Sequence, residues 1–131
     1  MLLTHFRTFY FLLISSPVML PFAQANGEFT DIDCRNPVGS YEANYCTEQE
    51  LNRLDATLKQ TLQSKLALLS DQTNRVEQLK LAQTRWEDFR EAHCDFETSL
   101  DFGTGLVGRI MQCHVSLGNQ RLEYLQTISK D

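Results

Sequence analysis

The feature that most limits how this chain can fold is an apolar stripe between residues 76 and 100. Its members recur at steps of three and four residues, the period of one face of an α-helix. They are Val76, Leu79, Ala82, Trp86, Phe89, His93, Phe96 and Leu100. The stripe predicts a helix over 72–100 that packs against other elements, with Trp86, Phe89 and Phe96 in the core.

Two further segments show the same period. Leucines repeat from Leu51 to Leu69 and predict a helix over 40–69 that begins near Ser40 or Thr47. Residues 106–128 predict a third helix, and short breaks separate the three. No segment has the alternation of a strand. We therefore expect an all-α fold, a small three-helix up-down-up bundle.

The beginning of the chain resembles an export signal. Arg7 precedes a mostly apolar run, and Ala23-Gln24-Ala25 is a small-x-small cleavage pattern. A membrane anchor is the less favoured alternative, because Pro17 and Pro21 interrupt the run and about 20 unbroken apolar residues are needed to span a bilayer. We expect a signal peptide over 1–25, cut after Ala25, and a periplasmic or secreted protein without a membrane segment.

The mature chain would comprise a loop or leader over 26–39 and a helical domain over 40–131. The whole chain has a formal net charge of −5, and removal of the signal takes away Arg7 but no acid. An acidic domain does not favour nucleic acid or anionic lipid as a partner. It favours a cationic protein.

All four cysteines lie in the mature part, and an even number in a small exported domain predicts two disulfides. Cys94 and Cys113 lie at similar distances on either side of the turn at 101–105, so antiparallel helices would bring them side by side. The favoured pairing is therefore Cys94–Cys113 with Cys34–Cys46, which would staple the leader to the first helix. A crossed connectivity remains an alternative, because sequence alone does not fix pairing.

Residues typical of catalytic or metal sites do not form a convincing group. His93-Cys94 and Cys113-His114 could supply zinc ligands, but helix neighbours point about 100° apart and exported cysteines usually oxidise. Gly103-Thr104-Gly105 lacks the lysine of a phosphate-binding loop, and no GxSxG motif is present. We expect a protein that is not an enzyme and uses no metal or cofactor.

Four acids dominate the rest of the second helix. Glu87, Glu91 and Asp95 are four residues apart, with Asp88 beside them, on the side away from the apolar stripe. Like charges at this spacing slightly destabilise an isolated helix, so stability does not explain the row. The row is either a solvated surface or a docking face for a cationic protein. Arg90 could pair with an acid on a neighbouring helix.

Several of these residues form a pattern that resembles the LprI-like lysozyme-inhibitor family of exported bacterial proteins. The resemblance covers about Cys34 to Leu125, and an AQxxWxxFRxxxC core carries it. The matching residues are Cys46, Asp55, Leu58, Leu79, Lys80, Ala82, Gln83, Trp86, Phe89, Arg90, Cys94, Phe96, Glu97, Cys113, Arg121 and Leu125. Lys59 and Leu62 stand where the family often has asparagine and tyrosine.

The resemblance implies a disulfide-bonded helical domain that inhibits lysozyme. We expect non-covalent occlusion of the lysozyme cleft, with the turn at Asp101 and Phe102 as the inserting element and the four acids steering a cationic enzyme. Trp86, Phe89, Arg90 and Phe96 are assigned structural roles. The alternative is an envelope protein with a structural, stress-linked or immunity role and a partner other than lysozyme.

Overall fold

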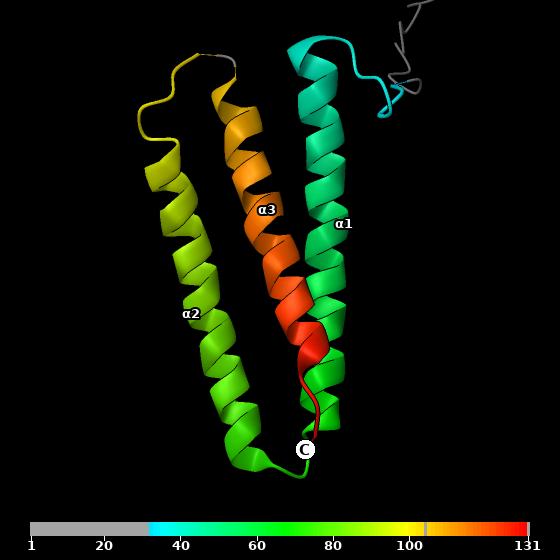
Figure 1. Ribbon diagram of the computed structural model, residues 1–131, viewed down its shortest axis with the longest axis vertical. Helices are drawn as coiled ribbons and strands as arrows, with labels where there is room; N and C mark the ends of the chain where they lie inside the picture. The colour runs from blue at the N-terminus through cyan, green and yellow to red at the C-terminus, as the bar shows by residue number, and fades with distance from the viewer. Residues whose placement is uncertain (1–31, 104, 131) are drawn as a thin grey trace, which may run out of the picture.

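The computed structural model describes residues 32–103 and 105–130, and the expected signal peptide lies outside them. The described part contains three helices and no strand, α1 (Gly39–Leu68), α2 (Thr73–Glu97) and α3 (Leu106–Thr127). Successive helices run antiparallel to one another (Figure 1), so the predicted all-α up-down-up bundle is confirmed. Within these residues no helix is long and apolar enough to cross a membrane.

The helix α2 ends at Glu97, three residues before the predicted end at residue 100. The hydroxyl of Thr98 donates to the carbonyl of Cys94 at 2.7 Å, and the amide of Asp101 donates to the Thr98 carbonyl at 2.9 Å. These bonds turn the chain out of the helix. Gly103 then adopts a φ of +85°, a left-handed conformation that favours glycine. Leu100 therefore lies in the turn and not on the helix.

The helices α1 and α3 form the tightest pair of the bundle. A Cβ atom built on Gly118 would lie 2.7 Å from Leu54 Cδ2, and one built on Gly108 would collide with the side chain of Asn44. Because these two glycines lack side chains, α3 can approach α1 closely. The buried core forms along this contact and beside the start of α2, and consists of Leu54, Leu58, Leu69, Leu79 and Leu125.

The helix α2 is less intimately packed than the other two. It leans on α3, makes little direct contact with α1, and diverges from α1 along its length (Figure 1). The disulfide Cys94–Cys113, with S–S 2.01 Å, fastens the upper part of α2 to α3, and Cys94 is fully buried. Cys34–Cys46 ties the leader to α1. The favoured pairing is thus confirmed and the crossed connectivity is wrong.

The predicted core of α2 is partly wrong. Trp86 packs against the buried cluster as expected, but Phe89 is 52% exposed, Phe96 is 73% exposed and Leu100 is 85% exposed. The inward side of α2 is occupied by Leu79, Gln83, Arg90 and Cys94 instead. The helix is turned so that polar side chains with partners on α1 and α3 face inward, and this places Phe89 and Phe96 in solvent.

Candidate functional site

A groove of about 630 Å³ lies between α1 and α2, where the two helices diverge. Leucines of α1 form one wall, Trp86 and charged residues of α2 form the other, and His114 of α3 contributes to the lining. The lining residues are Leu51, Asp55, Leu58, Lys59, Leu62, Gln83, Trp86, Glu87, Arg90, Glu91 and His114. Three residues of the family pattern in the second helix, Gln83, Trp86 and Arg90, therefore face a groove and not a sealed core.

Arg90 spans this groove. Its Nη1 donates to Asp55 Oδ1 at 2.9 Å, so the expected pairing of Arg90 with an acid on another helix is present. The Arg90 side chain is only 12% exposed, whereas that of Asp55 is 49% exposed. The guanidinium carbon also lies 5.3 Å from the centroid of the Trp86 ring, within range of a cation–π contact.

A second arginine, which is buried, lies near the same indole ring. Arg121 of α3 is 9% exposed, and its guanidinium carbon is 5.7 Å from the Trp86 ring centroid. Its Nε donates to Gln83 Oε1 at 3.0 Å, and Gln83 Nε2 donates to Glu87 Oε1 at 3.0 Å. Burial lowers the pKa of the Arg121 guanidinium, while the charge of Glu87 acts in the opposite direction.

In the described part of the chain, two nitrogen donors of this cluster lack a hydrogen-bond acceptor, and both belong to arginines beside Trp86. Arg90 Nε and Arg121 Nη2 are buried and have no hydrogen-bond acceptor among the described residues. Both belong to guanidinium groups that lie against Trp86, whose π electrons attract cations and can accept weak N–H contacts. Trp86 therefore holds two arginines of different helices together. The sequence pattern indicates Trp86 and Arg90 but not the contact between Gln83 and Arg121, since the facing positions of these two residues depend on how α2 is rotated about its axis.

The predicted acidic row is divided between two surfaces. Glu87 and Glu91 line the groove, and His114 Nε2 lies 4.0 Å from Glu91 Oε2. Asp88 and Asp95 are exposed and do not line the groove. The expectation that all four acids lie on the side away from the apolar stripe does not hold for Glu87 and Glu91, because they line the groove together with Trp86 of that stripe.

The turn between α2 and α3 carries the other predicted residues. Asp101 Oδ2 accepts a hydrogen bond from Arg109 Nε at 2.6 Å, which ties the turn to the first part of α3. Phe102 is 84% exposed. The nearby Cys94–Cys113 disulfide anchors the same end of the bundle. Phe102 is thus an exposed apolar tip of a turn that the Asp101–Arg109 pair holds to α3. The charge of Asp101 is compensated within the domain by this pair.

The described residues offer neither a cluster of metal ligands nor a free thiol. Within residues 32–103 and 105–130 no group of three or more His, Cys, Asp or Glu side chains could hold a metal ion. All four cysteines are in disulfides. His114 has Glu91 as a neighbour, and the structure brings no nucleophilic thiol to it.

The fold defines a small, acidic, disulfide-bonded helical domain. The family model described as Lysozyme inhibitor LprI matches residues 34–125, and the chain belongs to this family. The match includes both disulfides and the Asp55, Trp86, Arg90 and Arg121 cluster. A search of curated proteins and a search of solved structures each found no match.

Proposed function

We propose that this protein is an exported, non-covalent inhibitor of lysozyme. The observation that carries the proposal is the family match over residues 34–125, which includes nearly all of the described domain. The charge of the chain agrees with it, since a formal net charge of −5 would attract the cationic lysozymes of animals. Inhibition by occupation of the substrate cleft requires no covalent step.

The inserting element in this proposal is the turn at Asp101 and Phe102. An exposed loop tip can enter a cleft that is too narrow for a helix. Phe102 supplies the apolar contact, and the Asp101–Arg109 pair keeps the turn in place. This pair restrains Asp101 before binding, so less of the binding free energy would be spent on ordering that part of the turn.

In this proposal the acidic side chains of α2 raise the rate of association with lysozyme. Glu87, Asp88, Glu91 and Asp95 are all exposed and add negative charge to α2. Rim charges of this kind raise the association rate and its dependence on salt more than they raise the final affinity. The division of the acids between two surfaces means that their contributions are separable by mutation.

A turbidity assay tests the proposed function. The mature, oxidised protein is mixed with a cationic animal lysozyme and bacterial cell walls at low and at physiological salt. We expect near-stoichiometric inhibition that persists at physiological salt and weakens in the Phe102→Ser variant. Leu81→Ser, which alters an exposed leucine in the first half of α2, is the matched control and should inhibit normally.

Inhibition that is confined to low salt would indicate general charge attraction and would contradict the proposal. Absence of inhibition at both salt concentrations would favour a different envelope partner. Capture of a defined non-lysozyme protein from the envelope fraction would then identify it.

A further inference from the structure

Three large apolar side chains lie unburied along the outer side of α2 and the start of the following turn. Phe89 is 52% exposed, Phe96 is 73% exposed and Leu100 is 85% exposed. We call these three residues the outer strip. Burial of large apolar side chains stabilises a fold by roughly 1.5–3 kcal/mol each, so leaving them in solvent forgoes stability. Clustered exposed apolar residues mark interaction sites more often than isolated ones do.

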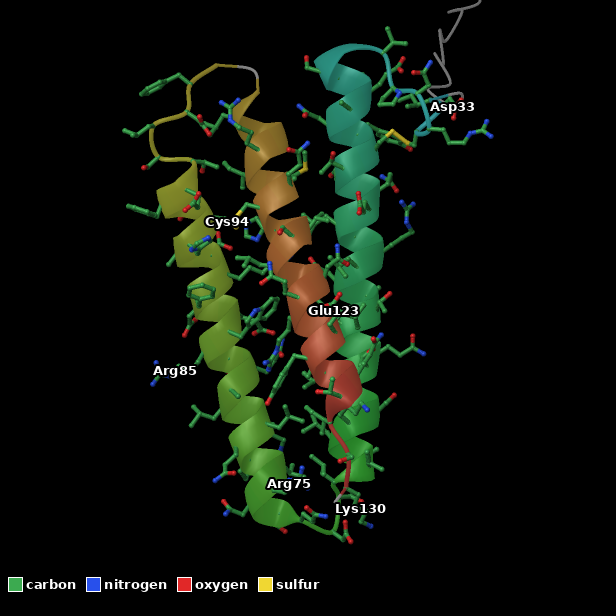
Figure 2. The ribbon with its side chains drawn as sticks, in the orientation of Figure 1. Asp33, Arg75, Arg85, Cys94, Glu123 and Lys130 are labelled. Atoms are coloured by element: carbon green, nitrogen blue, oxygen red, sulfur yellow. A yellow bond between two sulfur atoms is a disulfide. The ribbon has the colours of Figure 1, made fainter. Side chains whose placement is uncertain are left out.

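The outer strip is a separate surface from the groove between α1 and α2. Phe96 lies eleven residues after Arg85, about three helical turns, and so on the same side of α2. Figure 2 shows Arg85 pointing away from α1 and α3. None of the outer-strip residues lines the groove. The ring of His93 lies 5.2 Å from that of Phe89 and continues the strip toward Phe96.

The strip leads directly to the turn that the proposed function uses. Its α2 portion extends over about 12 Å from Phe89 to the end of the helix. Leu100 and Phe102 follow in the turn, and Phe102 is 84% exposed. A stable protein complex buries roughly 800 Å² on each partner, more than one loop tip offers. The strip would supply the additional contact area beside the inserted tip.

The acids beside the strip indicate which kind of partner it fits. Asp88 and Asp95 directly precede Phe89 and Phe96 and are exposed, and Arg85 on the same side of α2 is exposed as well, so these acids outnumber that cation by two to one. In the part of the chain that the structure describes, neither acid has an ion pair or hydrogen-bonded partner of its side chain. Aromatic anchors with a rim of free acids match a protein surface that has an apolar patch bordered by lysines or arginines.

We propose that the outer strip is the main contact surface for the cationic lysozyme, with Phe96 and Leu100 as its anchors and Asp88 and Asp95 as its charged rim. This inference rests on the proposed function and adds a surface outside the cleft. In this arrangement the groove around Trp86 holds the bundle together and stays outside the interface. The outer strip would bind the enzyme surface beside the substrate cleft while the turn enters the cleft.

The test compares two double variants with the wild-type protein. Phe96→Gln with Leu100→Gln removes the anchors, and both sites are exposed enough to accept glutamine without unfolding. Leu68→Gln with Leu81→Gln alters two exposed leucines away from the outer strip and is the control; Leu68 is 40% exposed and Leu81 is 59% exposed. Binding to a cationic animal lysozyme is measured by calorimetry, and inhibition is measured separately by turbidity, both at physiological salt.

We expect the anchor variant to bind at least about tenfold more weakly, as is usual for loss of interface hot spots, and the control to stay within about twofold of wild type. Unchanged binding and inhibition by a folded anchor variant would overturn the proposed role of the outer strip and leave the proposed inhibitory function intact. Wild-type binding without inhibition, lost in the anchor variant, would support the strip and contradict the inhibitory function.

Two further outcomes would also overturn the inference. One is a wild-type protein that neither binds nor inhibits, which would refute both proposals. The other is a wild-type dimer, seen by analytical ultracentrifugation, that the anchor variant converts to a monomer with inhibition unchanged. The strip would then be the surface between two copies of this chain.

Discussion

Arg90 of α2 donates to Asp55 of α1 at 2.9 Å and thereby joins two helices that make little direct contact with each other. The pair is unequal in exposure, with a nearly buried guanidinium and a half-exposed carboxylate. Such a pair stabilises mainly by keeping a buried cation compensated, since an unpaired buried charge is strongly unfavourable. The contact crosses the groove between α1 and α2, which Asp55 and Arg90 both line.

Replacement of Asp55 by alanine should therefore lower the free energy of unfolding. We expect a loss of about 1–2 kcal/mol, less than for a fully buried pair because Asp55 is half in water. Urea denaturation followed by the fluorescence of Trp86, the single tryptophan of the chain, measures it. Asp88→Ala is the control, because Asp88 is also a helical aspartate but has no ion-pair partner among the described residues. Equal losses in the two variants would contradict a special role for the pair.

The position of Arg90 also shows what the sequence could and could not predict. Helix number, helix order and both disulfides followed from the 3.6-residue period and from the symmetry of Cys94 and Cys113 about the turn. The inward face of α2 did not follow, because a search for apolar periodicity ignores buried polar residues. Gln83 and Arg90 face inward since they have partners on α3 and α1, and only the folded chain brings those partners within reach.

The candidate site was likewise predictable from the sequence only in part. Phe89 and Phe96 have the spacing of core residues, and sequence alone gives no reason to place them in solvent. Asp101 and Phe102 could be assigned to a turn from the adjacent glycines, but the Arg109 contact that holds the turn is a feature of three dimensions. The division of the acids followed from the rotation of α2, which was not predictable without the Trp86 cluster.

The two disulfides should differ in their contribution to stability. Loop-closure entropy alone gives each about 3 kcal/mol, since the cysteine separations of 12 and 19 residues are similar. Cys94 is fully buried and its bridge joins two helices, so Cys94→Ala with Cys113→Ala also leaves an unfilled space. Cys34 is exposed, and without its bridge the leader can regain freedom while the helices stay packed.

We therefore expect removal of the Cys94–Cys113 bridge to lower Tm by clearly more than removal of Cys34–Cys46. Thermal unfolding followed by circular dichroism compares the two double alanine variants directly. Equal Tm losses would show that loop entropy dominates, and the argument from burial would then be wrong.

Because α3 approaches α1 closely at Gly118, we expect any side chain at this position to lower the free energy of unfolding. The added Cβ of Gly118→Ala would lie 2.7 Å from the Cδ2 atom of buried Leu54. Overpacking of this kind costs about 1–3 kcal/mol, while alanine in place of a helical glycine returns about 1 kcal/mol. We expect a net loss of up to about 2 kcal/mol in urea denaturation. Ser116→Ala, at an exposed site on the same helix, controls for helix propensity and should be neutral or stabilising.

Two charge-matched pairs of substitutions test whether the divided acids have different roles in lysozyme binding. Asp88→Asn with Asp95→Asn removes two charges beside the outer strip, and Glu87→Gln with Glu91→Gln removes two charges at the groove. Rim charges act mainly on association, so the first pair should slow association by roughly three- to tenfold at low salt and leave dissociation nearly unchanged. The second pair should have a smaller effect on association, because its carboxylates face the groove.

Surface plasmon resonance on immobilised lysozyme at low and physiological salt measures both rates. At physiological salt the difference between the two variants should shrink, since the Debye length falls to about 8 Å and exposed charges are screened. The total charge of the two variants is the same, so any difference reflects position alone. Equal slowing by both pairs would mean that the enzyme responds to net charge, and the assignment of Asp88 and Asp95 to the rim of the interface would fail.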